Sequence, residues 1–174
     1  MKNELPTETI TIDNIERIYD FIFAPYVKQL KLSFLKIEEG RVVARLENSK
    51  EYQFVTGALS GQVIMSVIDT TMSIAMNTSL KSQRGTLSQN NNFIRPAFGD
   101  YFIIESVVQR FGSTIAIGET KVYSENNKNE FILPTTTLTR VFAGDTIKTV
   151  FTRSIPVSEN KTILYWKIYR KETV

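Results

Sequence analysis

Asp69 is the acidic residue of the clearest helix that this sequence predicts. Apolar residues recur at helical spacing from Val63 to Ala75 and form one broad face. The opposite face holds Gln62, Ser66, Asp69 and Ser73. A carboxylate in such a place could act as a general base or a nucleophile. On the pattern alone it is more often a solvated or hydrogen-bonded acid, so both interpretations stand.

Two residue types common in active sites are absent from the chain. It has no cysteine and no histidine. Disulfides, thiolate nucleophiles and cysteine metal sites are therefore excluded, as are the Ser-His-Asp triad and histidine metal sites. Any catalysis must use other side chains or backbone groups, and neither a metal nor a cofactor is expected.

Strands surround this helix in the sequence. A helix is predicted to begin at Asp13 and to break at Pro25. Turn signals and β-rich segments predict strands at the following ranges: 41–47, 86–94, 101–110, 114–124, within 131–142, 145–153 and 162–170. This order predicts an α+β fold, an antiparallel sheet with one central helix. Residues 1–138 are predicted to form the main domain with its N-terminal helix, and 139–174 a C-terminal β-hairpin extension of the same domain.

Several segments of the sequence resemble the motifs of a single protein family. Residues 61–70, GQVIMSVIDT, resemble its central-helix motif, which opens with His-Gly-Gly and continues to Leu-x-Asp. Residues 86–97, TLSQNNNFIRPA, resemble its second-strand signature, which ends Phe-Leu-Arg-Pro-Ala. Gly99-Asp100 and the turn at 110–112 follow in the family's order. With these motifs the chain resembles the hotdog-fold acyl-CoA thioesterases of the PaaI type. The resemblance covers about residues 22–138 and implies a sheet wrapped around the helix.

The resemblance also implies an activity and catalytic roles. The family hydrolyses acyl-CoA to a free acid and CoA, with active sites at the interface between protomers. Asp69 would be the general base or nucleophile, and the backbone amide of Gly61 would polarise the thioester carbonyl. Thr86 falls where relatives carry a hydroxyl that helps to place the water. The implied partners are an acyl-CoA substrate and a second protomer, in a homodimer or a dimer of dimers.

Further positions match those that hold pantetheine and phosphates in relatives. They are Arg95, Arg110, Gly112, Ser113 and Thr114. Arginine suits phosphates because its guanidinium is a planar fork of donors. Met65, Met72 and Met76 are interpreted as core or interface packing in preference to the lining of an acyl tunnel.

The chain departs from the family motif at two positions. Ser60 stands where the family has histidine, and Gln62 replaces the second glycine beside the substrate. Ser60 could donate a hydrogen bond over a shorter reach. These changes keep an alternative open, a hotdog protein that binds acyl-CoA or serves in a larger assembly without turnover. A hotdog dehydratase is disfavoured because those enzymes use a catalytic histidine.

Composition limits the other functional classes. Twenty-one Lys and Arg against 18 Asp and Glu give a net charge of +3, and these charges are scattered. Nucleic acid is therefore not an expected partner. No apolar run approaches the roughly 18 residues of a membrane-spanning helix, and residues 1–12 do not have the pattern of a signal peptide. We expect a cytoplasmic protein without a membrane partner.

Overall fold

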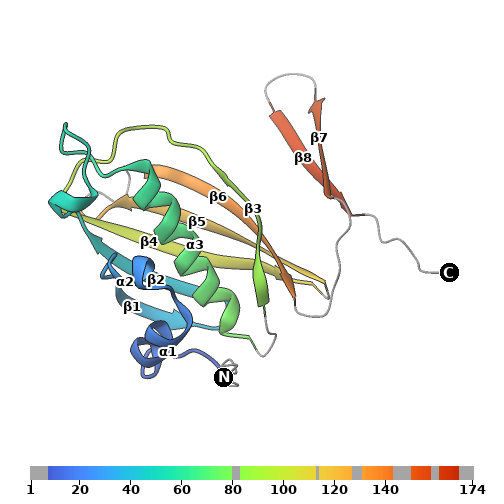
Figure 1. Cartoon of the computed structure of the whole chain (residues 1–174). Coiled ribbons are helices and arrows are strands. Elements are labelled where there is room, and N and C mark those ends of the chain that lie inside the picture. The colour runs from blue at the N-terminus through green and yellow to red at the C-terminus, as the bar shows by residue number, and fades with distance from the viewer. Residues whose placement is uncertain are drawn as a thin grey trace. The chain divides into compact units, whose positions relative to one another are not determined.

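A six-stranded antiparallel sheet holds the longest helix on one of its faces (Figure 1). The computed structural model describes residues 8–79, 83–112, 114–126, 131–142, 150–157 and 161–168. In chain order its elements are α1 (Ile15–Ile22), α2 (Pro25–Lys28), β1 (Ser33–Glu38), β2 (Arg41–Glu47), a 3-10 turn (Lys50–Tyr52), α3 (Gly61–Asn77), β3 (Gln83–Asn91), β4 (Tyr101–Phe111), β5 (Ile115–Ser124), β6 (Phe131–Phe142), β7 (Val150–Val157) and β8 (Lys161–Ile168). The strand order is β1-β2-β4-β5-β6-β3, so β1 and β3 are the two edges. The predicted α+β architecture is confirmed.

The strands form because apolar and polar residues alternate along them. In β2, Val42, Ala44 and Leu46 are fully buried, whereas the residues between them are partly exposed. In β4, Phe102 and Ile104 are buried in the same core cluster. The sheet therefore presents an apolar face to α3 and a polar face on its other side.

Helix α3 is buried on most of its circumference. Ser60 caps its N-terminus by accepting a hydrogen bond from the Val63 amide at 3.4 Å. Met72 and Met76 have no exposed surface, as expected for core packing, whereas Met65 is 39% exposed. No helix in the described part of the chain is both long and apolar enough to cross a membrane.

A chain of buried hydroxyls joins α3 to the sheet. Thr71 Oγ1 lies 2.8 Å from Ser106 Oγ, which lies 2.8 Å from Thr120 Oγ1. Thr71 also donates to the Val67 carbonyl at 2.9 Å, so it must accept the hydrogen bond from Ser106. Each hydroxyl is satisfied, and the chain fixes the position of α3 along β4 and β5.

Gly118 lets α3 approach β5 closely. A Cβ at this position would lie 2.4 Å from Met72 Sδ and 3.1 Å from the Val107 carbonyl oxygen. Because Met72 is fully buried, its side chain has little room to move away. We expect Gly118→Ala to lower the free energy of unfolding by about 1–3 kcal/mol, measured by urea denaturation.

The matched control for that substitution is Gly85→Ala, because among the described residues no atom beyond its chain neighbours lies within 4 Å of a Cβ there. In a Met72→Ala background the cost of Gly118→Ala should fall, since the atoms that clash are gone. Strictly additive costs of the two substitutions would contradict the contact as the cause.

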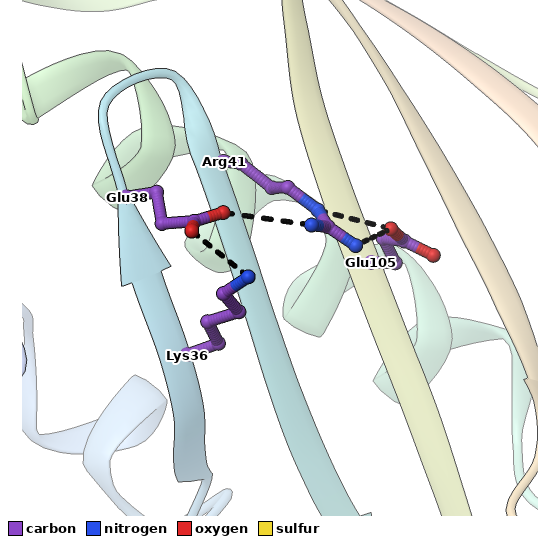
Figure 2. A network of polar contacts seen from close by, with 4 residues as sticks. All are labelled: Lys36, Glu38, Arg41 and Glu105. Carbon is purple, nitrogen blue, oxygen red and sulfur yellow. Dashed lines mark hydrogen bonds and ion pairs between the residues drawn. The ribbon is translucent and has the colours of Figure 1, made fainter.

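Charged side chains of both signs lie on the outer face of β1, β2 and β4 (Figure 2). Arg41 reaches Glu105 at 2.6 Å and Glu38 at 3.5 Å, and Lys36 reaches Glu38 at 2.8 Å. The hydrogen bond from Lys36 lowers the pKa of the Glu38 carboxyl. These groups are partly exposed, so each ion pair contributes little stability. Their main effect is to keep this face of the sheet polar.

The smaller compact unit, Gly144–Val174, contains β7 and β8 as an antiparallel pair. The larger unit is Met1–Ala143. A final pair of strands was predicted here, at ranges that the observed strands overlap. The predicted boundary after residue 138 falls inside β6, which runs to Phe142. That the last residues extend the same domain stays a prediction.

Two details of the N-terminal half differ from the expected elements. Helix α1 begins at Ile15 with Asn14 as its N-cap, so the cap predicted at Asp13 is wrong by one residue. Asn14 is held there because its Oδ1 accepts a hydrogen bond from the Thr11 amide at 2.8 Å. Strand β1 was not predicted at all. The break at Pro25 is confirmed, because α1 ends at Ile22 and a separate helix, α2, begins at Pro25.

Candidate active site

The structure brings Asp69 and Thr86 together, although they are 17 residues apart. Thr86 Oγ1 donates a hydrogen bond to Asp69 Oδ1. Asp69 lies in the middle of α3 and is half-buried, while Thr86 lies on β3 and is exposed. Figure 1 shows β3 at the edge of the sheet beside α3. The carboxylate is therefore oriented by a hydroxyl and remains accessible from solvent.

A β-bulge follows Thr86 directly. In the pairing with β6, Thr86 is opposite Arg140 and Ser88 is opposite Thr139, so Leu87 is the extra residue. Bulges change the direction of neighbouring side chains and are frequent next to active sites. This irregularity accompanies the placement of the Thr86 hydroxyl beside α3.

The second part of the site is the start of α3. Gly61 is the first helical residue, and in the described part of the chain its N–H has no hydrogen-bond acceptor. Such amides at a helix N-terminus carry partial positive charge and favour an anion or a polarised carbonyl. The ring of Phe93 lies beside it, with Cζ 3.6 Å from the position of a Gly61 Cβ.

Gly61, Met65 and Asp69 lie on one stripe of α3, because they are spaced by four residues. At 1.5 Å per residue, Gly61 and Asp69 are about 12 Å apart along the helix axis. A single thioester carbonyl cannot contact both groups of the same helix. If both act in one reaction, they must come from two copies of the chain.

Two loops close around the start of α3. Asn48 Nδ2 donates to the carbonyls of Gly57, at 3.2 Å, and Gly99, at 2.8 Å. The Leu59 amide donates to the Ala97 carbonyl at 2.9 Å. Gln53 Nε2 donates to the Asn48 carbonyl at 2.8 Å, which gives this amide a structural role. The loops before α3 and after β3 are thus held together as one rim.

The positions at which the family motif is altered lie at this rim. The Ser60 hydroxyl oxygen is occupied as the helix cap, and Ser60 is half-buried. Gln62 is exposed, and its backbone carbonyl accepts a hydrogen bond from the Ser66 hydroxyl at 2.9 Å. That either residue contacts substrate stays a prediction.

The predicted CoA-binding residues are not gathered within one copy of the chain. Arg95 precedes β4 and Arg110 is near its end, and both side chains are exposed. The strand between them, β4, is extended, and about ten residues of it span about 30 Å from its first residue to Arg110. Thr114 is half-buried near Arg110, and Ser113 lies outside the described residues. Gly112 makes the β4–β5 turn possible, because a Cβ would lie 2.6 Å from the Ile115 carbonyl oxygen.

Two residues of this region had no role assigned from the sequence. Gln89 Nε2 donates to the Met65 carbonyl at 3.3 Å and to Asn91 Oδ1 at 3.0 Å, which ties β3 to α3. Phe93 is half exposed against Gly61. Phe93 belongs to the quoted strand signature, but only the structure shows that its ring faces the helix start.

Comparisons with known proteins agree with this architecture. The family model described as Thioesterase superfamily matches residues 56–130. A protein of Saccharolobus solfataricus that carries a provisional name as an esterase is 30% identical over 118 residues, which cover 67% of this chain and 81% of that protein. The chain belongs to the hotdog thioesterase superfamily.

Solved structures show the same fold. The Escherichia coli PaaI protein from the phenylacetic acid degradation operon superposes with a TM-score of 0.66 at 16% identity, over 77% of this chain and 94% of that one. Zebra fish thioesterase superfamily member 2 gives a TM-score of 0.65 at 16% identity, over 76% and 99%. A hypothetical thioesterase from Streptococcus pneumoniae, solved with coenzyme A, gives 0.57 at 15% identity, over 63% and 84%.

Proposed function

We propose that this protein hydrolyses acyl-CoA thioesters to a free acid and CoA. The observation that carries the proposal is the hydrogen bond from Thr86 to Asp69, at a place where Asp69 is only half-buried and Thr86 is exposed. Membership of the thioesterase superfamily supports the reaction class. The structural relative from Streptococcus pneumoniae, solved with coenzyme A, supports CoA as the thiol part of the substrate.

In this mechanism Asp69 acts as general base, and Thr86 keeps its carboxylate in one orientation. Asp69 takes a proton from a water molecule, whose oxygen attacks the thioester carbonyl carbon. The Gly61 amide donates to the carbonyl oxygen as negative charge develops there. Collapse of the tetrahedral intermediate breaks the carbon–sulfur bond and releases CoA thiolate, which takes up a proton. Direct attack by Asp69 through an acyl-enzyme anhydride is the nucleophilic variant of the same site.

The separation of Gly61 and Asp69 implies a site shared between two protomers. We propose that the Gly61 amide of one copy and the Asp69 carboxylate of the other act on the same thioester. Strand β3 is an edge of the sheet, where a second copy could pair with it, and Thr86 lies on this strand. A dimer of dimers would bring further copies together without changing this requirement.

Mixing two inactive variants tests the shared site. Asp69→Asn and Gly61→Pro protomers are refolded together, and thiol release is compared with that of each variant alone. If sites are shared, the mixed dimer keeps one intact site, and a random mixture regains about a quarter of wild-type activity. Activity no higher than that of the parents, in a mixture proven to contain mixed dimers, would contradict shared sites.

The second candidate function is acyl-CoA binding without turnover. It is favoured by Ser60, whose hydroxyl oxygen caps α3 where the family has a histidine. The two functions are separated by one pair of measurements on the wild-type protein, thiol release from acyl-CoAs and the shift in melting temperature that they cause. Stabilisation with thiol release supports hydrolysis, and stabilisation without it supports the binding function.

A further inference from the structure

Met65 differs from the other methionines of α3 in being accessible. Met65 is 39% exposed, whereas Met72 and Met76 have no exposed surface. It lies on the stripe between Gly61 and Asp69, one helical turn from each. An apolar, flexible side chain thus lies one helical turn from the Gly61 amide, the group that the proposed reaction uses to polarise the thioester carbonyl. Its backbone is held in place by the hydrogen bond from Gln89.

Phe93 supplies a second apolar surface at the same place. Its side chain comes from the loop after β3 and lies against Gly61, although the residue is 47% exposed. The other large apolar residues of this loop, Ile94 and Phe98, are 55% and 57% exposed. Because the Leu59 amide bonds to the Ala97 carbonyl, the loop is tied to the segment that leads into α3.

We propose that Met65 and Phe93 form the acyl subsite, and that it selects an uncharged, apolar acyl group. This inference rests on the proposed function. A thioester whose oxygen contacts the Gly61 amide has its acyl carbon next to the Phe93 ring and one helical turn from Met65. Burial of their exposed surface against an acyl chain is favourable, and the unbranched Met65 adapts to chains of different shape.

Charge gives the second reason for this selectivity. Asp69 is the only charged residue between Gly61 and Asn77. An acyl group that ends in a carboxylate would therefore meet apolar surface and a negative charge, with no cation on this helix to compensate. Dicarboxylic acyl groups are disfavoured, and aliphatic or aromatic acyl groups are favoured.

The test is a panel of acetyl-, hexanoyl-, benzoyl- and succinyl-CoA with thiol detection. We expect wild type to prefer hexanoyl- and benzoyl-CoA. Met65→Ala and Phe93→Ala should each lower kcat/KM for these two by about tenfold or more, and change acetyl-CoA by less than about threefold. The matched control is Leu35→Ala, since Leu35 is 52% exposed on β1, the opposite edge of the sheet.

Three outcomes would overturn the acyl subsite. The first is a preference for succinyl-CoA, and the second is an equal loss on all substrates, acetyl-CoA included. The third is dissociation of the oligomer by light scattering with unchanged selectivity, which would make these side chains a contact between protomers.

Binding separates failure of the subsite from failure of the proposed hydrolysis. If wild type releases no thiol from any substrate, S-hexyl-CoA and CoA are compared by calorimetry. Tighter binding of S-hexyl-CoA to wild type, lost in Met65→Ala and Phe93→Ala, upholds the subsite although hydrolysis has failed. Equal affinity for S-hexyl-CoA and CoA overturns it.

Discussion

Asp69→Asn is expected to lower kcat for thiol release by about 10²–10⁴-fold and to leave the fold intact. Asparagine has the shape of aspartate, and its Oδ1 can still accept the hydrogen bond from Thr86. What is lost is the negative charge and the ability to take a proton from water. The measurement is single-turnover thiol release from hexanoyl-CoA, with the melting temperature of each variant recorded beside it.

The matched control is Asp13→Asn, because Asp13 is an exposed acid in the turn before α1. It should change neither the rate nor the melting temperature. If Asp69→Asn kept more than about a tenth of wild-type kcat, the carboxylate would not act as base or nucleophile. A large drop in melting temperature with Asp69→Asn would instead identify Asp69 as a structural acid.

The helix that carries Asp69 could be predicted because its signals are local. Apolar residues recur every three or four positions from Val63 to Ala75. The structure starts the helix at Gly61, and the cap at Ser60 was not predicted. The strand at Arg41–Glu47 was, like the helix, predicted from a local signal, since apolar residues alternate strictly along it.

Strand β1 could not be predicted because its pattern is broken. The pairing with β2 shifts register between Phe34 and Lys36, so Leu35 is an extra residue and strict alternation is lost. Both of its faces are at least partly exposed, and its apolar residues do not define a buried side. A bulge in an edge strand carries no local sequence signal of the kind that glycine or proline gives to a turn.

The contact between Thr86 and Asp69 required more than periodicity. Resemblance to the family named both residues, but the distance between them depends on β3 returning to the edge of the sheet beside α3. Arg95 and Arg110 show the opposite case. They were grouped by motif, and the length of β4 separates them in one copy of the chain. Only a second protomer could place such residues in one binding site, and a single sequence does not specify how two copies associate.

The Gly61 amide is tested by a substitution that removes the N–H and leaves the helix start in place. Proline is favoured at the first position of a helix, where the N–H has no partner within the helix. Ser60 already has φ −70° and ψ 144°, within the region that a residue before proline adopts. Gly61→Pro is therefore expected to fold and to lower kcat by about 10²–10³-fold, the usual effect of losing one donor to a developing oxyanion.

Gly61→Ala is the control that separates the lost donor from added bulk. It keeps the N–H, and its Cβ would lie 3.6 Å from Phe93 Cζ, an ordinary contact. Its kcat for thiol release should stay within about threefold of wild type, because the amide that donates to the oxyanion is unchanged. Equal losses in Gly61→Pro and Gly61→Ala would mean that crowding against Phe93, and not the amide, determines the rate. The polarisation of the carbonyl would then have to come from another donor.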